Sequence, residues 1–181
     1  MFRPSRALTV AALLVYSAVM ITLTTLKSFY RIGYLWDPEV HRRRELRLTP
    51  FGEIGDTTNW FIPVFGYLGN LAFFVPFGLV VYVLLFRTRR PLLYATLAGL
   101  GFSVTIECAQ FLFALGYTDI DDVLMNTLGG FLGAWIARLF GPRFHGVWVR
   151  LALVVGAIFA VLVGLGERLG DPAKIVENQQ L

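Results

Sequence analysis

Charged residues are scarce in this sequence. Asp, Glu, Lys and Arg make up 15% of its 181 residues, whereas an average soluble domain carries about 25%. Hydrophobic residues account for 56% of the chain, and the mean hydropathy is +0.65. The composition therefore excludes an ordinary soluble domain and indicates an integral membrane protein.

Cysteine and histidine are also scarce, which limits the metal and redox chemistry of the chain. Cys108 is the single cysteine and lies in an apolar run, so it can form neither a disulfide within the chain nor a cysteine-based metal site. The two histidines, His41 and His145, lie in basic stretches without metal-ligand spacing, and we expect them to be solvated. The sequence predicts no metal site and no cofactor.

Five apolar runs are long enough to cross a hydrocarbon core of about 30 Å. The first run is longer than the roughly 7 to 15 residues of a signal-peptide core, so we expect it to remain as an uncleaved span. The predicted fold is an all-α, polytopic membrane helical bundle, a single domain over residues 1–181 with no room for a separate soluble enzyme domain. The predicted spans are residues 7–26, 68–86, 92–115, 123–140 and 147–165.

Charge placement predicts the orientation of these spans. Arginines gather before the first span, between the second and third, and around the link from the fourth to the fifth, and short basic loops stay on the cytoplasmic side. The amino terminus is then inside, and the acidic link 116–122 and the carboxyl terminus are outside. We expect an aromatic-rich external loop over residues 27–67. The arginines orient helices in this interpretation, and nucleic-acid binding is not expected.

Polar side chains inside the spans gather near one end of the bundle. Glu107 and Gln110 lie one turn apart in the third span, and Asp122 and Asn126 lie one turn apart at the start of the fourth, so each pair shares a helix face. At a rise of about 1.5 Å per residue, all of them fall in the outer half of the bundle. We therefore predict a ligand pocket open to the outer leaflet, formed by Asn70, Glu107, Gln110, Asp119, Asp122 and Asn126.

Structural interpretations of the same residues stand beside this prediction. The amides can hydrogen-bond between helices as packing contacts worth about 0.6 to 2 kcal/mol each, and the acidic link can be a solvated turn in which Asp122 caps the fourth helix. Glu107 fits a structural role least well, because a carboxyl group at that depth is rare without a function. A catalytic role or a cation site needs a third element that the spacing does not identify.

Small residues in the fourth span predict close helix packing. Gly129 and Gly133 form a GxxxG pattern, which lets two helix backbones approach each other. We favour a contact within the chain over a dimer seam. Pro76 in the second span is expected to free a backbone carbonyl and to kink that helix.

Three motifs in order give the sequence a likeness to a known family. They are GNLAFFVPFG at 69–78, IECAQ at 106–110 and DIDDVLMNTLGG at 119–130. With the upstream pair Pro50 and Phe51, this combination over residues 46–140 resembles the VanZ-like family. The resemblance implies a small polytopic protein of the bacterial inner membrane, related to one that gives low-level resistance to teicoplanin, and implies no agreed biochemical activity.

The resemblance also marks characteristic residues. Those that carry over are Asn70, Pro76, Glu107, Gln110, Asp119, Asp122 and Asn126. One departure is Gly116, which stands three residues before the first Asp of the acidic turn, where family members often have arginine. A pairing that such an arginine makes with a carboxylate or a lipid phosphate is absent at this position.

Three hypotheses of function follow from these observations. In the first, a protein without an assigned activity binds an amphiphilic envelope molecule, such as a lipid-linked precursor or a lipoglycopeptide, at the outer pocket and contributes to glycopeptide resistance. In the second, an enzyme acts on a lipid-linked envelope precursor with Glu107 as acid or base. In the third, a structural membrane subunit assembles through its glycine face. Membrane lipids are expected partners in all three, and the oligomeric state stays open.

Overall fold

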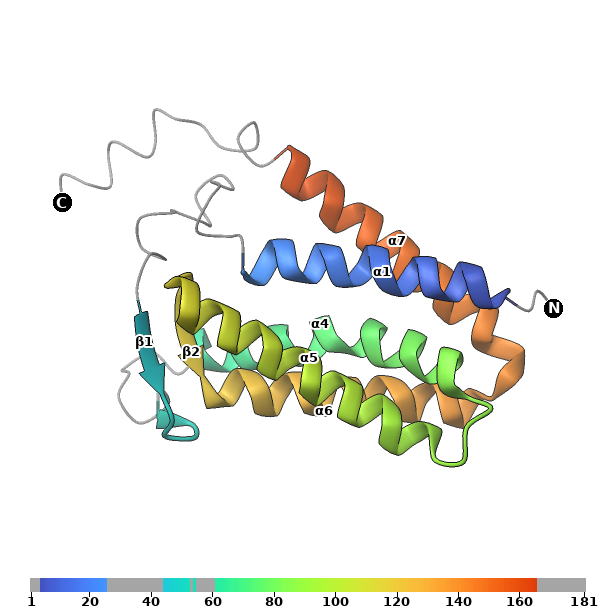
Figure 1. The fold of residues 1–181 in the computed structure, drawn as a ribbon, viewed down its shortest axis with the longest axis horizontal. Coiled ribbons are helices and arrows are strands. Elements are labelled where there is room, and N and C mark those ends of the chain that lie inside the picture. The colour runs from blue at the N-terminus through green and yellow to red at the C-terminus, as the bar shows by residue number, and fades with distance from the viewer. Residues whose placement is uncertain (1–3, 26–43, 53, 55–60, 166–181) are drawn as a thin grey trace.

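The computed structural model describes residues 4–25, 44–52, 54 and 61–165 of the chain. Within them, five helices are long and apolar enough to cross a membrane, which confirms the predicted all-α polytopic bundle (Figure 1). A short 3-10 turn, η2 Pro142–Phe144, precedes the last of them. Most of the predicted external loop 27–67 lies outside the described residues. The five long helices are α1 Arg6–Thr24, α4 Phe61–Leu85, α5 Pro91–Phe113, α6 Ile120–Phe140 and α7 His145–Gly164.

The helix boundaries agree with the predicted spans to within a few residues, with one exception. α4 begins at Phe61 rather than at residue 68, so the assignment of residues 61–67 to a loop was wrong. Pro63 suits this position, because the N–H groups of a first helical turn have no intrahelical acceptor to lose. Phe61 and Phe65, one turn apart, stack with a ring-centroid distance of 5.8 Å.

α4 is the central helix of the bundle. It packs against all four other long helices and most extensively against α6, and Figure 1 shows α1 and α7 on one side of it, α6 on the other, and α5 crossing the view diagonally. Phe74 and Val80 of α4 are fully buried. The hydroxyl of Tyr16 in α1 donates a hydrogen bond to the Phe73 carbonyl at 2.9 Å, close to Pro76, which lies inside α4. The bond falls on the carbonyl next to that of Ala72, the residue four positions before Pro76 whose carbonyl loses its helical donor.

The outward faces of the bundle are apolar. Large hydrophobic side chains are exposed along the helices, whereas a soluble protein rarely exposes a continuous apolar surface of this kind. Hydrocarbon solvates such a surface at no cost, so the exposure pattern fits a protein immersed in lipid. Examples are Leu14, Phe65, Leu112, Leu139 and Val161.

Glycines bring α4 and α6 into backbone contact. A Cβ atom added at Gly129 would collide with the carbonyl of Leu71, and one at Gly133 would collide with the carbonyl of Val75. The GxxxG face therefore packs inside the chain, which confirms the favoured interpretation. The third hypothesis loses its motivating observation, because α4 already covers the face that was to mediate assembly.

A small parallel sheet lies at one end of the bundle, where the sequence predicted only a loop and a turn. β1 Arg44–Arg47 pairs with β2 Gly116–Asp119, and Arg44 is the register partner of Gly116. The guanidinium of Arg47 lies 4.2 Å from the centre of the Tyr117 ring and 2.8 Å from a carboxylate oxygen of Glu45. The sheet joins the segment before α4 to the link between α5 and α6.

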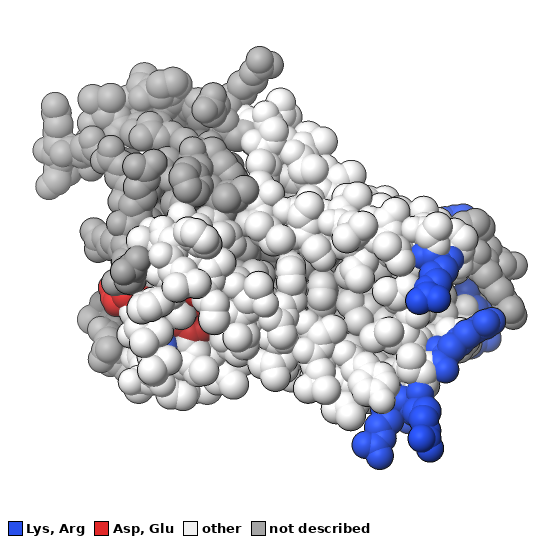
Figure 2. All heavy atoms as spheres, in the orientation of Figure 1, with Lys and Arg blue, Asp and Glu red and all other residues white. Residues whose placement is uncertain are grey.

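Charges are separated along the bundle axis. Figure 2 shows arginines gathered at the end where the amino terminus lies and acidic side chains at the opposite end. The basic end contains the start of α1, the α4–α5 link and the α6–α7 link, as Figure 1 shows. The acidic end contains the two strands and the start of α6. The three basic segments therefore share one end, as the charge pattern predicts.

Candidate functional site

The acidic turn at the start of α6 is fixed by its middle carboxylate. Asp121 is buried, with 1% of its surface exposed. Its two carboxylate oxygens accept from the Phe51 backbone N–H at 3.0 and 2.9 Å, and one also accepts from the Tyr67 hydroxyl at 2.9 Å. The rings of Phe51 and Tyr67 meet edge to face with centroids 5.7 Å apart. Asp121 thus ties together the Pro50–Phe51 segment, α4 and α6.

Asp119, not Asp122, caps α6. The Asp119 side chain accepts from the Asp121 N–H at 2.8 Å, and the helix begins at the next residue, Ile120. The prediction that Asp122 caps the helix was wrong, because α6 begins three residues before the predicted span. Asp122 lies in the first helical turn, where a carboxylate interacts favourably with the helix dipole.

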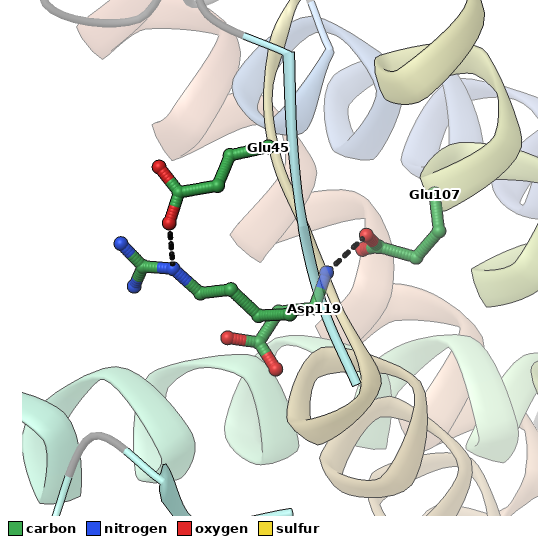
Figure 3. Close-up of polar contacts among 4 residues, drawn as sticks. Glu45, Glu107 and Asp119 are labelled. Atoms are coloured by element: carbon green, nitrogen blue, oxygen red, sulfur yellow. Dashed lines mark hydrogen bonds and ion pairs between the residues drawn. The ribbon is translucent and has the colours of Figure 1, made fainter. Parts of the chain in front are cut away.

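Glu107 is buried and points toward the acidic turn. Only 5% of its surface is exposed, and its carboxylate accepts a hydrogen bond from the Asp119 backbone N–H at 3.0 Å (Figure 3). The Thr118 hydroxyl donates to the Glu107 carbonyl at 3.3 Å. The side chain therefore faces protein neighbours at the end of the bundle and does not point into the apolar outer surface.

Each amide of the predicted site holds two helices together. The Asn70 amide donates to the Asp122 carboxylate, between α4 and α6. The Gln110 amide donates to the Thr24 carbonyl at 3.1 Å, and this carbonyl belongs to the last turn of α1, which has no intrahelical donor to accept from. The packing interpretation of these donor groups is therefore correct.

The oxygen atoms of two amides, unlike their nitrogens, have no hydrogen-bond partner among the described residues. Asn126 donates through its nitrogen to the Ser103 hydroxyl at 2.9 Å, but its oxygen is buried without a hydrogen-bond partner in the described part of the chain. The oxygen of Gln110 is in the same state. Leaving a buried acceptor unsatisfied costs about 1 to 3 kcal/mol. Both residues line the same cavity.

A cavity of about 240 Å³ lies where these side chains meet. Asn70, Glu107, Gln110, Asp122 and Asn126 all line it, so the structure brings five of the six predicted residues together. Asp119 is absent from the lining; its carboxylate caps α6 instead. The apolar part of the wall comes from α1, α4, α5 and α7, through Leu23, Phe73, Ile106 and Phe159. All five long helices thus contribute to one polar cavity with apolar walls.

Sequence reasoning missed several residues that build this site. Ser103 and Glu107 lie one turn apart on α5, a spacing that places Ser103 on the polar face. Thr24 carried no such signal, because its contribution is a backbone carbonyl. Tyr67 and Phe51 act through Asp121, which the sequence analysis treated as part of a solvated turn.

The carboxylates of the acidic turn do not converge. Asp119 caps the helix. Asp121 accepts hydrogen bonds from Phe51 and Tyr67, and Asp122 accepts one from Asn70. The described ranges contain no group of three or more His, Cys, Asp or Glu side chains placed to hold a metal ion. The arrangement therefore offers hydrogen-bond acceptors to a ligand rather than a chelating cluster.

Five helices that are long and apolar enough to cross a membrane define a multi-pass membrane protein, and all five contribute to the polar cavity at its acidic end. Residues 13–141 match the family model described as VanZ/LLP1. The chain is 32% identical over 152 residues to Protein VanZ of Enterococcus faecium, an alignment that covers 83% of this chain and 87% of that relative. The chain therefore belongs to the VanZ/LLP1 family, which confirms the resemblance seen in its motifs. No solved structure matches it.

Proposed function

We propose that this protein binds an amphiphilic molecule of the bacterial cell envelope in the cavity at its acidic end. The observation that carries the proposal is the cavity itself, whose lining combines two carboxylate residues and three amide residues with apolar side chains. Such a site recognises a headgroup rich in N–H or O–H donors that is attached to an apolar body. Amines and sugar hydroxyls are headgroups of this kind.

The size of the cavity limits what it encloses. Its volume of about 240 Å³ falls below the roughly 300 to 1,000 Å³ of sites that bury a whole drug-sized ligand. It therefore takes one sugar or one amine-bearing group, while the remainder of the ligand lies along the membrane surface. A lipid-linked precursor or a lipoglycopeptide can bind in this way.

The charge separation supports an external position for the cavity. The arginine-rich short segments lie at the opposite end of the bundle (Figure 2). Such segments stay in the cytoplasm. We place the protein in the inner membrane, with its amino terminus inside, its carboxyl terminus outside and its acidic cavity open to the outer leaflet.

Family membership supports glycopeptide resistance as the physiological role. The test is the teicoplanin concentration that inhibits a susceptible bacterium expressing the wild-type chain, Glu107→Gln or Glu45→Gln. Glu45 is the matched control, because it is an exposed carboxylate on β1 outside the cavity. We expect the wild type and Glu45→Gln to raise the inhibitory concentration severalfold and Glu107→Gln to lose most of that protection. Equal protection by all three chains would reject the cavity as the site.

A catalytic role is the second candidate, and it rests on Glu107 being buried inside the cavity beside Asp122. A carboxylate in this position can exchange a proton with a bound headgroup. The purified protein would then convert a lipid-linked envelope precursor, and Glu107→Gln would abolish the conversion while leaving binding intact. Turnover that persists in Glu107→Gln would remove Glu107 from any catalytic role.

A further inference from the structure

A second cavity lies at the basic end of the bundle, far from the acidic one. Its volume is about 650 Å³. The start of α1, the end of α4, the α4–α5 link and the start of α7 enclose it. The polar residues in its lining are Arg6, Thr9, Arg87, Thr88 and His145. Among the described residues, none of those that line this cavity is acidic.

Two arginines give the cavity its positive charge. Arg6 and Arg87 both reach its lining, and both are exposed. Neither guanidinium forms an ion pair with any part of the chain that the structure describes. The described acidic residues that could neutralise them lie at the opposite end of the bundle (Figure 2). An anion entering this space therefore meets two cations that have no competing partner.

His145 adds a buried polar atom to the same cavity. Its side chain is 5% exposed, so the expectation that it is solvated was wrong: the ring packs edge to face on Phe86, with centroids 4.9 Å apart. Its Nε2 atom has no hydrogen-bond partner among the described residues. A buried imidazole nitrogen without a partner is costly, and the residue that carries it is among those lining the basic cavity.

The backbone at this point favours an anion as well. His145 is the first residue of α7, and no side chain caps that helix. η2 leads directly into α7, and the His145 N–H already donates to the Pro142 carbonyl, so the helix contributes the positive end of its dipole rather than a row of free donors. This dipole adds to the charges of Arg6 and Arg87, which line the same cavity as His145.

We propose that this basic cavity binds a phosphate group, supplied either by the headgroup of an anionic phospholipid or by a free phosphate. The apolar residues Leu84 and Phe86 in the same lining provide a surface for the glycerol and acyl part of a lipid. Basic pockets between membrane helices are known to take anionic headgroups. The site shares no lining residue with the acidic cavity, so this proposal does not depend on the proposed function.

The test measures ligand-induced thermal stabilisation of the full-length protein in a phosphate-free maltoside. The probes are short-chain phosphatidylglycerol and inorganic phosphate, added separately. The double variant Arg6→Gln/Arg87→Gln removes the cavity charges, and Arg89→Gln/Arg90→Gln removes two arginines of the α4–α5 region that do not line the cavity. Both doubles change the net charge equally, which controls for non-specific attraction.

We expect phosphatidylglycerol to stabilise the wild type and the Arg89→Gln/Arg90→Gln control alike, and the cavity double to weaken its apparent affinity at least about tenfold, as loss of charge-assisted hydrogen bonds implies. His145→Phe keeps the aromatic packing and should also weaken binding. Stabilisation by inorganic phosphate with the same arginine dependence would identify free phosphate as the ligand. Equal losses in both doubles, or no stabilisation of the wild type by either probe, would overturn the proposal.

Discussion

The carboxylate of Asp121 accepts a hydrogen bond from the backbone N–H of Phe51, a residue 70 positions earlier in the chain. The Phe51 nitrogen lies 3.0 and 2.9 Å from the two carboxylate oxygens. Tyr67 donates to the same carboxylate from α4. These bonds hold the start of α6 at the position where Asp122 and Asn126 enter the acidic cavity. The geometry of the site therefore depends on a residue that does not line it.

Asp121→Ala should destabilise the protein by about 2 to 4 kcal/mol, because it leaves the buried Tyr67 hydroxyl and the partly buried Phe51 N–H without their acceptor. Tyr67→Phe removes one of the bonds and should cost about 1 kcal/mol. Thermal unfolding in detergent measures both. Leu46→Ala is a control, since this exposed residue of β1 is far less buried. A stability of Asp121→Ala equal to that of the control would show that the carboxylate does not anchor the turn.

Gly133→Ala should destabilise the bundle by about 1 to 3 kcal/mol, the range observed for overpacking. Its new methyl group would meet the Val75 carbonyl, which belongs to the α4 backbone and cannot rotate away. Gly101→Ala is the matched control: it also lies in a long helix, and its methyl group would meet nothing within 4 Å. The control should be neutral or stabilised by about 0.5 to 1 kcal/mol. Unfolding temperatures that move in the same direction in both variants would contradict the close α4–α6 contact.

Glu107→Gln and Glu107→Leu should separate the structural role of this side chain from its part in binding. Glutamine keeps an oxygen that can accept from the Asp119 N–H, so its stability should stay close to that of the wild type. Leucine leaves that N–H unpaired and should cost about 1 to 3 kcal/mol. Unfolding curves of the two variants provide the measurement. If both are equally stable, the bond to Asp119 contributes nothing to the fold.

Membrane orientation is testable with single cysteines in a Cys108→Ala background. Leu46→Cys places an exposed thiol on β1 at the acidic end, and Thr88→Cys places one in the link at the basic end. A thiol reagent that does not cross membranes should label Leu46→Cys in intact cells and Thr88→Cys only after permeabilisation. The reverse pattern would place the acidic cavity on the cytoplasmic side and reject the proposed orientation.

The spans and the clustering of polar residues could be predicted because each depends on local sequence. A run of apolar residues specifies a spanning helix, and the spacing of Glu107 and Gln110 places them on one face of it. The acidic turn then marks which end of the bundle these residues occupy. These signals were enough to bring Asn70, Glu107, Gln110, Asp122 and Asn126 to a common cavity.

The remaining features depend on contacts between distant segments. The pairing of β1 with β2 joins residues 44–47 to 116–119. A four-residue strand has too short a sequence pattern to predict which segment it pairs with. The burial of His145 follows from the packing of Phe86 on its ring. The basic residues around His145 in the sequence indicated a solvated position instead. The cap of α6 was assigned to Asp122 instead of Asp119 because apolar periodicity does not define a helix start to within three residues.

Phe159 of α7 contributes to the acidic cavity, although the family match ends at residue 141, before α7 begins. The polar floor of the site thus comes from the part of the chain that defines the family, whereas one apolar wall comes from outside it. Under the proposed function, replacement of this wall would alter ligand selectivity without disturbing the carboxylates and amides. Selectivity would then be carried by the last helix, separately from the polar residues that mark the family.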